Sequence, residues 1–231
     1  MPTKNRYVDF VSDEHFLKCV KWVCESYPVK SDVQLDIKKF KRNMIDPFKM
    51  LFDIINSKIS AEDWIKSEAR RQADKSINNR IGEFHQKLLG GVDGWEDVGK
   101  GHPLGIDLAK KDDKIFIELK NKHNTVKGDD LKNVFDKLKK VADRHPDAIV
   151  YYAYIVPEKA SSGELIWKTS QREPNSHIHK AWGSKVYEIV TGDKSALEKT
   201  WKALPHSIND KYKLSSDDTQ KLLEFFEAAF H

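Results

Sequence analysis

Apolar side chains in the N-terminal third of the chain recur at steps of three or four residues, the spacing of one helix face. The first such stripe follows Ser12, which can cap a helix that begins beside it. Asp46 and Pro47 have the order of an N-cap followed by proline at the first helical position, so a second helix is expected there. A third stripe begins after Ser60 and continues until Gly90 and Gly91. The pattern therefore predicts a helical N-terminal region that ends in one long helix or two nearly collinear ones.

Beyond Gly91 the spacing of apolar residues shortens to that of strands. Short strands are predicted at 105–109 and 114–121, separated by the polar residues KKDD. A helix with its own apolar stripe follows at about 129–143, and the run AIVYYAYIV at 148–156 has the continuous apolar character of a buried strand. This order of helix, strand, strand, helix and strand predicts a mixed β-sheet flanked by helices, of the α/β (α+β) class.

The C-terminal third completes the predicted domain. Strands are predicted at 164–168 and 185–192, on either side of a polar loop, and helices near 194–204 and 216–229. We therefore expect one domain over the whole chain, with three parts: an N-terminal helical extension (1–59), a core (60–156), and a part with the polar loop, strands and C-terminal helices (157–231).

The second strand of the core carries alternating charges. Successive side chains of a strand point to opposite faces, so Glu118, Lys120 and Lys122 share one face. If KKDD forms a loop with an even number of residues, directly opposed residues have numbers that add to an odd value near 223 or 225, and Asp107 lies on the face of Glu118. Such neighbours have Cβ atoms about 5 to 8 Å apart, so the two carboxylates can hold one divalent cation. Gly105, on the same face, leaves room beside it.

The triplet of an acid, any residue and lysine carries little weight by itself. It occurs four times, beginning at Asp36, Asp112, Glu118 and Asp130. Only Glu118 stands late in an apolar strand that follows another strand with an acid on the matching face. A surface ladder of ion pairs would also place opposite charges across strands, and it remains the alternative. Because two close carboxylates are unfavourable without a cation, a metal site is the preferred interpretation.

Composition and charge narrow the class of protein. The chain is 39% hydrophobic and 10% aromatic, as in a globular protein. A formal charge of +4, from 40 basic and 36 acidic residues, is compatible with a polyanionic partner and equally with an ordinary surface. The sequence has no apolar run of about 18 residues and no secretory signal, so we expect a cytoplasmic protein without a membrane partner. Cys19 and Cys24 lack further cysteines that would complete a zinc site, and they are expected to be reduced packing residues.

Asp107, the run Glu118-Leu119-Lys120 and the order of elements resemble the PD-(D/E)XK nuclease superfamily, although Ile106 stands where a proline usually precedes the aspartate. More narrowly, INNRIGEFHQKLLG, GWEDVG and IELKNKHNT resemble a group of small type II restriction endonucleases whose targets are GGNCC-like palindromes. This similarity extends over about residues 76–127, with a weaker echo in IWKTSQREPNSHI, GSKVYEIVTGD and LPHSI, and the N-terminal helices carry none of it. The resemblance implies a sequence-specific double-stranded DNA endonuclease with a nuclease core.

The resemblance also implies roles for single residues. Asp107, Glu118 and the main-chain carbonyl of Leu119 would bind Mg²⁺, and Lys120 would orient or activate the attacking water. The products would carry 5′-phosphate and 3′-hydroxyl ends. Glu83 is a candidate for a further acidic ligand, because the helix before the first strand often supplies one in this fold; a solvated helix flank is its alternative. The next loop holds three weaker rivals: Asp93, Glu96 and Asp97.

Candidate DNA contacts fall into two groups. The first continues directly from the metal-binding strand and comprises Lys122, His123 and Asn124. Lysine and histidine suit phosphates, and asparagine can read adenine. The second group lies in the polar loop and comprises Lys168, Arg172, Asn175, His177, His179 and Lys185. We expect this loop to read bases, since arginine or lysine paired with guanine suits a GC-rich target. A short palindromic target would call for a twofold homodimer.

Two other functions remain open at this point. A DNA repair or recombination nuclease can have the same fold, but the stretches around His85 and in NKHNT favour a restriction enzyme. A non-catalytic DNA-binding protein can keep a nuclease fold as a scaffold. The presence of both carboxylates and the lysine favours the enzyme.

Overall fold

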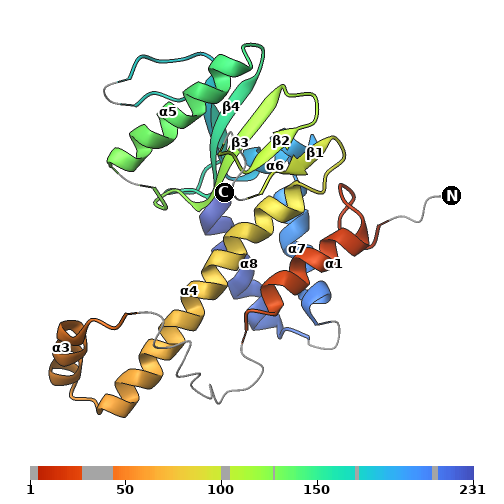
Figure 1. The fold of residues 1–231 in the computed structure, drawn as a ribbon. Coiled ribbons are helices and arrows are strands. Elements are labelled where there is room, and N and C mark those ends of the chain that lie inside the picture. Colours follow the sequence, from red (N-terminus) through yellow and green to blue (C-terminus); the bar gives the residue numbers. More distant parts are fainter. Residues whose placement is uncertain (1–4, 28–43, 100–104, 127, 170–171, 210–212) are drawn as a thin grey trace. The chain divides into compact units, whose positions relative to one another are not determined.

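The computed structural model describes residues 5–27, 44–99, 105–126, 128–169, 172–209 and 213–231 (Figure 1). Its internal contacts divide the chain into two compact units, residues 22–81 and residues 1–21 together with 82–231, and each is described by itself. The single domain with three parts that the sequence suggests stays a prediction.

Helices α1 (Asp13–Cys24) and α3 (Pro47–Ser57) begin where they are predicted. The hydroxyl of Ser12 accepts a hydrogen bond of 3.2 Å from a backbone N–H group in the first turn of α1. The side chain of Asp46 accepts two such bonds in α3, at 2.9 and 3.2 Å. Side chains of this kind satisfy donors that a helix start leaves unpaired, so both starts follow from local sequence, and both predicted caps are confirmed.

Helix α4 (Ala61–Leu89) is a single continuous helix of 29 residues. Ser60 caps it by accepting a hydrogen bond of 3.1 Å from the N–H group of Asp63. The helix ends immediately before Gly90, as predicted. A Cβ atom at Gly90 would lie 2.6 Å from the backbone nitrogen of Asp97, so only glycine lets the following chain pass this close to the helix end.

Residues 82–231 contain a mixed sheet with the strand order β1-β2-β3-β4-β6-β5 (Figure 1). Strands β3, β4 and β6 run parallel, and the β1–β2, β2–β3 and β5–β6 pairs are antiparallel. The strands have these bounds: β1 (Trp95–Asp97), β2 (Leu108–Lys110), β3 (Ile115–Lys122), β4 (Ile149–Val156), β5 (Gly163–Ile166) and β6 (Ile178–Trp182). Helix α5 (Asp129–Arg144) is the crossover between β3 and β4. This mixed sheet with flanking helices confirms the predicted α/β class.

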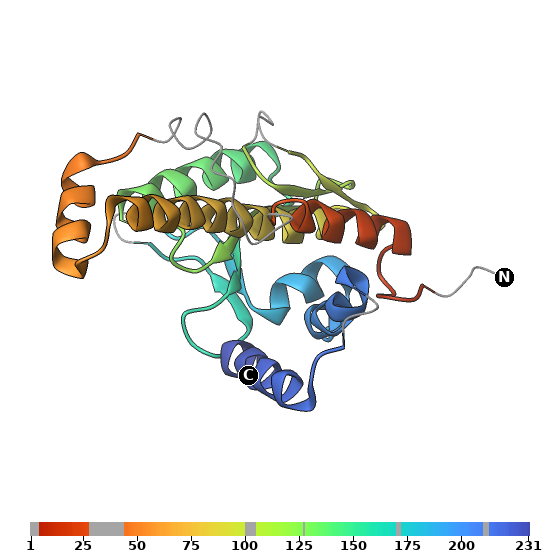
Figure 2. The ribbon, with the colours of Figure 1, turned by 90° about the horizontal axis from the view of Figure 1, so that it is seen from below.

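The alternation of side chains divides the sheet between two packed faces. On one face Phe116, Val150 and Tyr152 pack against Phe135 and Leu138 of α5, and each of these side chains is at most 1% exposed. Helix α6 (Ser184–Thr191) packs on β4, β5 and β6, on the other side of the sheet (Figure 2). Glu118 and Lys120 continue the face of Phe116 toward the end of β3, beyond the apolar cluster under α5.

The strand predicted at 185–192 is wrong, because these residues form α6. Its buried side chains, Val186, Tyr187 and Val190, have the spacing of one helix face, and Gly192 ends the helix in the left-handed conformation (φ 76°). The β-branched residues of the run suggested a strand, but the segment packs as a helix, so tertiary contacts decide. The strand that follows β4 in the parallel part of the sheet is β6. It lies in the segment predicted as a polar loop, where His179 and Lys180 obscure the alternation.

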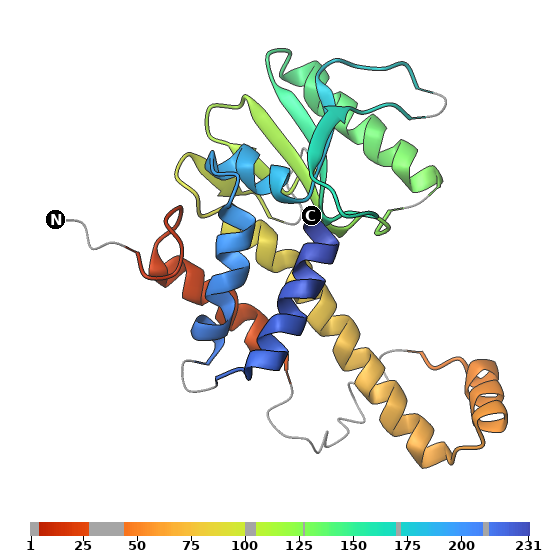
Figure 3. The same ribbon diagram turned by 180° about the vertical axis from the view of Figure 1, so that it is seen from behind.

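The remaining elements agree with the pattern except for one short strand. Helices α7 (Ala196–Ile208) and α8 (Ser216–Phe230), drawn in blue in Figure 3, correspond to the two predicted C-terminal helices. Strand β1 lies in the glycine-rich connection where no strand is predicted. Among the described helices, none combines the length and apolar character needed to cross a membrane.

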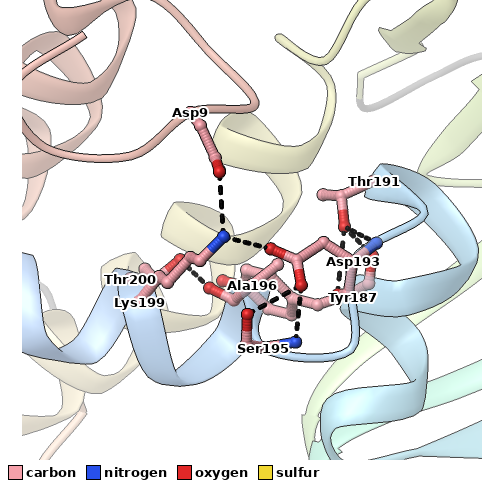
Figure 4. A network of polar contacts seen from close by, with 8 residues as sticks. All are labelled: Asp9, Tyr187, Thr191, Asp193, Ser195, Ala196, Lys199 and Thr200. Atoms are coloured by element: carbon pink, nitrogen blue, oxygen red, sulfur yellow. Dashed lines mark hydrogen bonds and ion pairs between the residues drawn. The ribbon is translucent and has the colours of Figure 1, made fainter.

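A polar network joins α6 to α7 (Figure 4). The carboxylate of Asp193 accepts hydrogen bonds from the N–H and hydroxyl groups of Ser195, at 2.8 and 2.7 Å, and from Lys199 Nζ at 2.6 Å. Lys199 also contacts Asp9, at 2.8 Å. The hydrogen bond from Lys199 and those from Ser195 lower the pKa of Asp193 to about 2. The same bridge fastens the N-terminal segment to the start of α7.

His85 gives the fold a predicted dependence on pH. Its ring lies against Phe84 and Tyr187, and ring Nδ1 is 2.7 Å from the Tyr187 hydroxyl. Burial lowers the pKa of His85 from 6.5 to about 4. Between these values the unfolded chain binds a proton that the native ring does not, so the free energy of unfolding falls as the pH falls from 6.5 toward 4.

We expect this histidine to cost about 2 kcal/mol of stability between pH 7 and pH 4.5, less than the full shift would give because this range ends above the native pKa of about 4. Urea unfolding of the wild type and of His85→Gln at both pH values measures it. The glutamine variant, which takes up no proton, should lose less stability on acidification by about that amount. Parallel losses in both proteins would contradict the assignment.

Candidate active site

The site is built on the β2–β3 hairpin. Leu108 pairs with Ile117 and Ala109 with Phe116, so opposed residues have numbers that add to 225, one of the two predicted registers. Asp107 lies in the bend just before β2, and its N–H group donates a hydrogen bond of 3.0 Å to the carbonyl of Ile117. Lys120 Nζ contacts the side chains of both Asp107 and Glu118. The hairpin therefore brings the two acids together on one face.

Near the end of β3, the side chain of Asp107 accepts a backbone hydrogen bond of the kind that a neighbouring strand would otherwise accept. Its Oδ2 accepts a hydrogen bond of 2.7 Å from the N–H group of Leu119. The N–H and carbonyl groups of one residue in a strand face the same neighbour, so the carbonyl of Leu119 also faces the side of Asp107. A main-chain oxygen thus lies on the same side of β3 as the carboxylate of Asp107.

Two ammonium groups contact the carboxylates. Lys120 Nζ is 2.5 Å from Oε1 of Glu118 and 3.5 Å from Oδ2 of Asp107. Lys137, from α5, places its Nζ 2.7 Å from Oε2 of Glu118. Glu118 is only 5% exposed, a degree of burial that a carboxylate tolerates when it is paired. The cluster is therefore a buried charge network at the edge of the apolar core.

Burial and charge act against each other in this network. Burial raises the pKa of Asp107 and the charge of Glu118 adds to the rise, while the charge of Lys120 partly offsets it. For Lys120, burial alone would lower the pKa, but the charges and hydrogen bonds of Asp107 and Glu118 raise it above its ordinary value. The lysine is thus held as a cation by the two acids.

These donors suit a hard divalent cation. Two carboxylates and a carbonyl supply the oxygen ligands that Mg²⁺ prefers, and waters would have to complete its shell. Lys120 and Lys137 neutralise the same carboxylate oxygens that a cation would use. In the described part of the chain, no group of three or more histidine, cysteine, aspartate or glutamate side chains forms a metal cluster, so the carbonyl and water would be needed.

Lys137 is the contact that reasoning from the sequence missed. It lies next to the apolar stripe of α5, a position that is usually solvated, and nothing in the local pattern relates it to β3. Gly105 makes room for it, since a Cβ atom there would lie 3.1 Å from Cδ of Lys137. The predicted space beside Gly105 is thus filled by the stem of a lysine. The positive φ of Gly105, 64°, also favours glycine there.

Comparison with known proteins identifies the family. Residues 8–213 match the family model described as Eco47II restriction endonuclease. The chain belongs to the Eco47II restriction endonuclease family. It is 35% identical over 215 residues to the type II restriction enzyme Sau96I of Staphylococcus aureus, which covers 89% of this chain and 81% of the relative. It is also 35% identical over 211 residues to the type II restriction enzyme Eco47II of Escherichia coli, covering 87% and 86%.

Membership in the Eco47II family makes this protein a type II restriction enzyme, a sequence-specific DNA endonuclease. The restriction-enzyme resemblance is confirmed, and it is preferred over a repair nuclease or a non-catalytic DNA-binding protein. Because the match begins at residue 8, it includes the N-terminal helices, and the expectation that they carry none of the resemblance was wrong. Enzymes of this class use a divalent metal ion.

Glu83 lies in the last part of α4. A Cβ atom at the preceding Gly82 would lie 3.6 Å from Cβ of Asn121, three residues beyond Glu118. This turn of α4 therefore contacts β3 on the face opposite Glu118. Among the rival acids, Asp97 accepts a hydrogen bond of 2.7 Å from Gln86.

The first group of candidate DNA contacts lies at the end of β3. Lys122 is exposed and shares the face of Glu118 and Lys120. The N–H group of His123 donates a hydrogen bond of 3.0 Å to the carbonyl of Val156, and its ring Nδ1 is buried without a hydrogen-bond partner among the described residues. Asn124 is exposed in the following turn. Residues 122–124 thus extend from the carboxylates toward solvent.

The structure does not gather the second group into one loop. Lys168 is exposed, whereas Arg172 forms two hydrogen bonds of 2.7 Å with Asp136 of α5. Lys185 belongs to α6 and lies 3.3 Å from a carboxylate oxygen of Glu188.

The other members of this group lie at the start of β6. Asn175 accepts a hydrogen bond of 2.8 Å from the N–H group of His177. The ring of His177 is 3.1 Å from the carbonyl oxygen of Ala148. His179 pairs with Tyr151 in the register and packs against its ring, on the face opposite Glu118. The two histidines are thus directed away from the carboxylate pair.

Proposed function

We propose that this restriction enzyme hydrolyses phosphodiester bonds of double-stranded DNA with Mg²⁺ as its cofactor, at a site formed by Asp107, Glu118 and Lys120. The observation that supports this most is the meeting of the two carboxylates across the β2–β3 hairpin, with Lys120 Nζ between them at 2.5 and 3.5 Å. The products carry 5′-phosphate and 3′-hydroxyl ends.

In this proposal Asp107, Glu118 and the carbonyl of Leu119 would hold Mg²⁺, which when bound would lower the pKa of water and neutralise charge on the phosphate. Glu83 would take part only through a bridging water, because its turn of α4 contacts β3 on the face opposite Glu118. Lys120 leaves the carboxylates and orients the attacking water, to which its ammonium group donates a hydrogen bond. Lys137 is released from Glu118 at the same time, so a positive charge becomes free beside the scissile phosphate.

The DNA contacts follow from the same placement. Lys122, His123 and Asn124 meet the backbone or base edges beside the cleaved bond, and Lys168 and Arg172 approach from the segment that precedes β6. Asn175, His177 and His179, at the start of β6, and Lys185, in the first turn of α6, take part only if the DNA extends to these segments. The target is a short palindromic, GC-rich, GGNCC-like site. One carboxylate pair per chain then calls for a homodimer, with one copy for each strand. The enzyme acts in the cytoplasm.

The experiment that tests the proposed function is digestion of a plasmid of known sequence with Mg²⁺, followed by mapping of every end. We expect cuts at one short palindrome, with 5′-phosphates that ligase can join. Random cuts, cleavage of single-stranded DNA alone, or full activity in EDTA would each contradict the proposal. Sedimentation on a cognate duplex gives the number of chains bound.

Arg172 and Lys122 are expected to separate specificity from affinity. Lys122→Ala should weaken binding to cognate and scrambled duplexes alike and flatten the salt dependence by about one unit, as for a lost phosphate contact. Arg172→Ala should cost about 1 to 3 kcal/mol at one base pair and little on scrambled DNA. Because Arg172 is paired with Asp136, Asp136→Asn is the matched control for the loss of that pair. Equal losses on both duplexes in Arg172→Ala would reject base reading.

A further inference from the structure

A row of side chains crosses the sheet from the carboxylate pair. Glu118 pairs in the register with Tyr152 of β4, and Tyr152 pairs with Lys180 of β6. Paired residues of neighbouring strands lie on the same face, so all three share the face of the proposed catalytic site. Strands are about 4.8 Å apart, which places the Cα atom of Lys180 roughly 10 Å from that of Glu118.

Lys180 is a half-buried cation with aromatic neighbours. Its Nζ lies 5.1 Å from the ring centre of Trp167 and 6.0 Å from that of Tyr152. In the part of the chain that the structure describes, no carboxylate pairs with it, in contrast to Lys120 and Lys137. Burial lowers the pKa of Lys180. Aromatic ring faces attract a cation, but this attraction does not replace a carboxylate partner.

The neighbouring hydroxyl lacks a partner as well. Tyr152 is 1% exposed, and its hydroxyl oxygen has no hydrogen-bond partner among the described residues. A buried donor without an acceptor is uncommon, and it usually indicates a missing water, ion or ligand. Tyr152 and Lys180 therefore both carry hydrogen-bond donors that have no acceptor among the described residues.

We propose that Lys180 binds a phosphate of the DNA backbone that flanks the scissile phosphate. An anion is the ligand that an uncompensated ammonium group favours, and DNA is the anionic substrate of this enzyme. Because Lys180 lies about two strand spacings from Glu118, this phosphate is distinct from the scissile phosphate bound near Asp107 and Glu118. The rings of Tyr152 and Trp167 lie beside the ammonium group of Lys180. The inference rests on the proposed placement of the catalytic site on this face.

A purely structural lysine would behave differently. Its Nζ lies over the ring of Trp167, so removal of the whole side chain could weaken binding through lost packing. Lys180→Met keeps an apolar stem and removes the charge, whereas Lys180→Arg keeps the charge. Lys202→Met is the matched control, because Lys202 forms an ion pair with Glu198 on α7. The charge is thus tested apart from the packing.

The test measures binding of the full-length protein to cognate and scrambled duplexes in Ca²⁺, which is expected to support binding without cleavage, from about 50 to about 200 mM salt. Lys180→Met should flatten the salt slope by about 0.9, so its deficit relative to wild type shrinks about 3.5-fold across that range. Lys180→Arg and Lys202→Met should keep the wild-type slope. A wild-type slope and affinity in Lys180→Met would overturn the proposal.

The position of the phosphate is tested with duplexes in which one phosphate at a time is an uncharged methylphosphonate. Wild type should lose affinity at a phosphate next to the scissile one, and Lys180→Met should be indifferent to that substitution alone. Equal sensitivity of both proteins at every position would refute the contact. This readout needs no cleavage, so it is distinct from failure of the catalytic assignment, which would appear as activity in variants of Asp107 or Glu118.

Discussion

Replacing Asp107 or Glu118 is expected to abolish cleavage of DNA while binding to DNA in Ca²⁺ survives. Each change removes a metal ligand, and the charge stabilisation that a bound cation supplies is worth several kcal/mol, so the rate should fall by about 10³-fold or more. Neither residue belongs to the segments proposed to contact DNA bases. The measurement is single-turnover cleavage of a cognate duplex in Mg²⁺, with binding followed in Ca²⁺ by fluorescence anisotropy.

The choice of substitution affects what this result means. Glu118 is buried between Lys120 and Lys137, and alanine there would leave two ammonium groups facing each other, which destabilises the fold. Asp107→Asn and Glu118→Gln keep the shape of each side chain and remove its charge, although the amide of Glu118→Gln can accept from only one of the two lysines. Asp112→Asn is the matched control, because Asp112 lies in the same hairpin with its carboxylate 3.2 Å from Lys110 Nζ. If Asp107→Asn or Glu118→Gln cleaved at a near wild-type rate, the site assignment would be rejected.

Lys120 is expected to affect cleavage and metal binding in opposite directions. Lys120→Met should lose most of the activity, because the ammonium group acts on the attacking water. The same variant should bind metal at least as tightly as wild type, since Lys120 Nζ contacts the oxygens of Glu118 and Asp107 that a cation would use. Calorimetry with Mg²⁺ in the absence of DNA measures the second effect.

A comparison with Lys137 distinguishes the two lysines. Lys137→Met removes the other ammonium group from Glu118, so it should also favour metal binding, but it should retain more activity than Lys120→Met. Normal turnover in Lys120→Met would show that Lys120 has only a structural role. Weaker metal binding in both variants would indicate that the lysines support the carboxylates, contrary to the competition proposed here.

The geometry of the hairpin follows from the sequence because it depends on short-range rules. A loop with an even number of residues and the alternation of side chains are enough to set Leu108 opposite Ile117, which places Asp107 beside the end of β3. The caps at Ser12, Asp46 and Ser60 are equally local, since each side chain satisfies donors within its own first turn.

Other features depend on contacts between distant segments. Lys137 reaches Glu118 only because α5 crosses back over the sheet, and no pattern within α5 records this. The row from Glu118 through Tyr152 to Lys180 requires the parallel registers of three strands joined by long connections. The segment 178–191 was assigned wrongly because its strand contains polar residues, while its helix contains β-branched ones.

The central claim is that Asp107 and Glu118 hold the catalytic metal ion, and anomalous diffraction from a crystal grown with cognate DNA and Mn²⁺ tests it most directly. We predict an anomalous peak about 2 Å from a carboxylate oxygen of each residue, with the ammonium groups of Lys120 and Lys137 displaced from Glu118. A peak bound elsewhere, with both lysines still paired to Glu118, would contradict the claim.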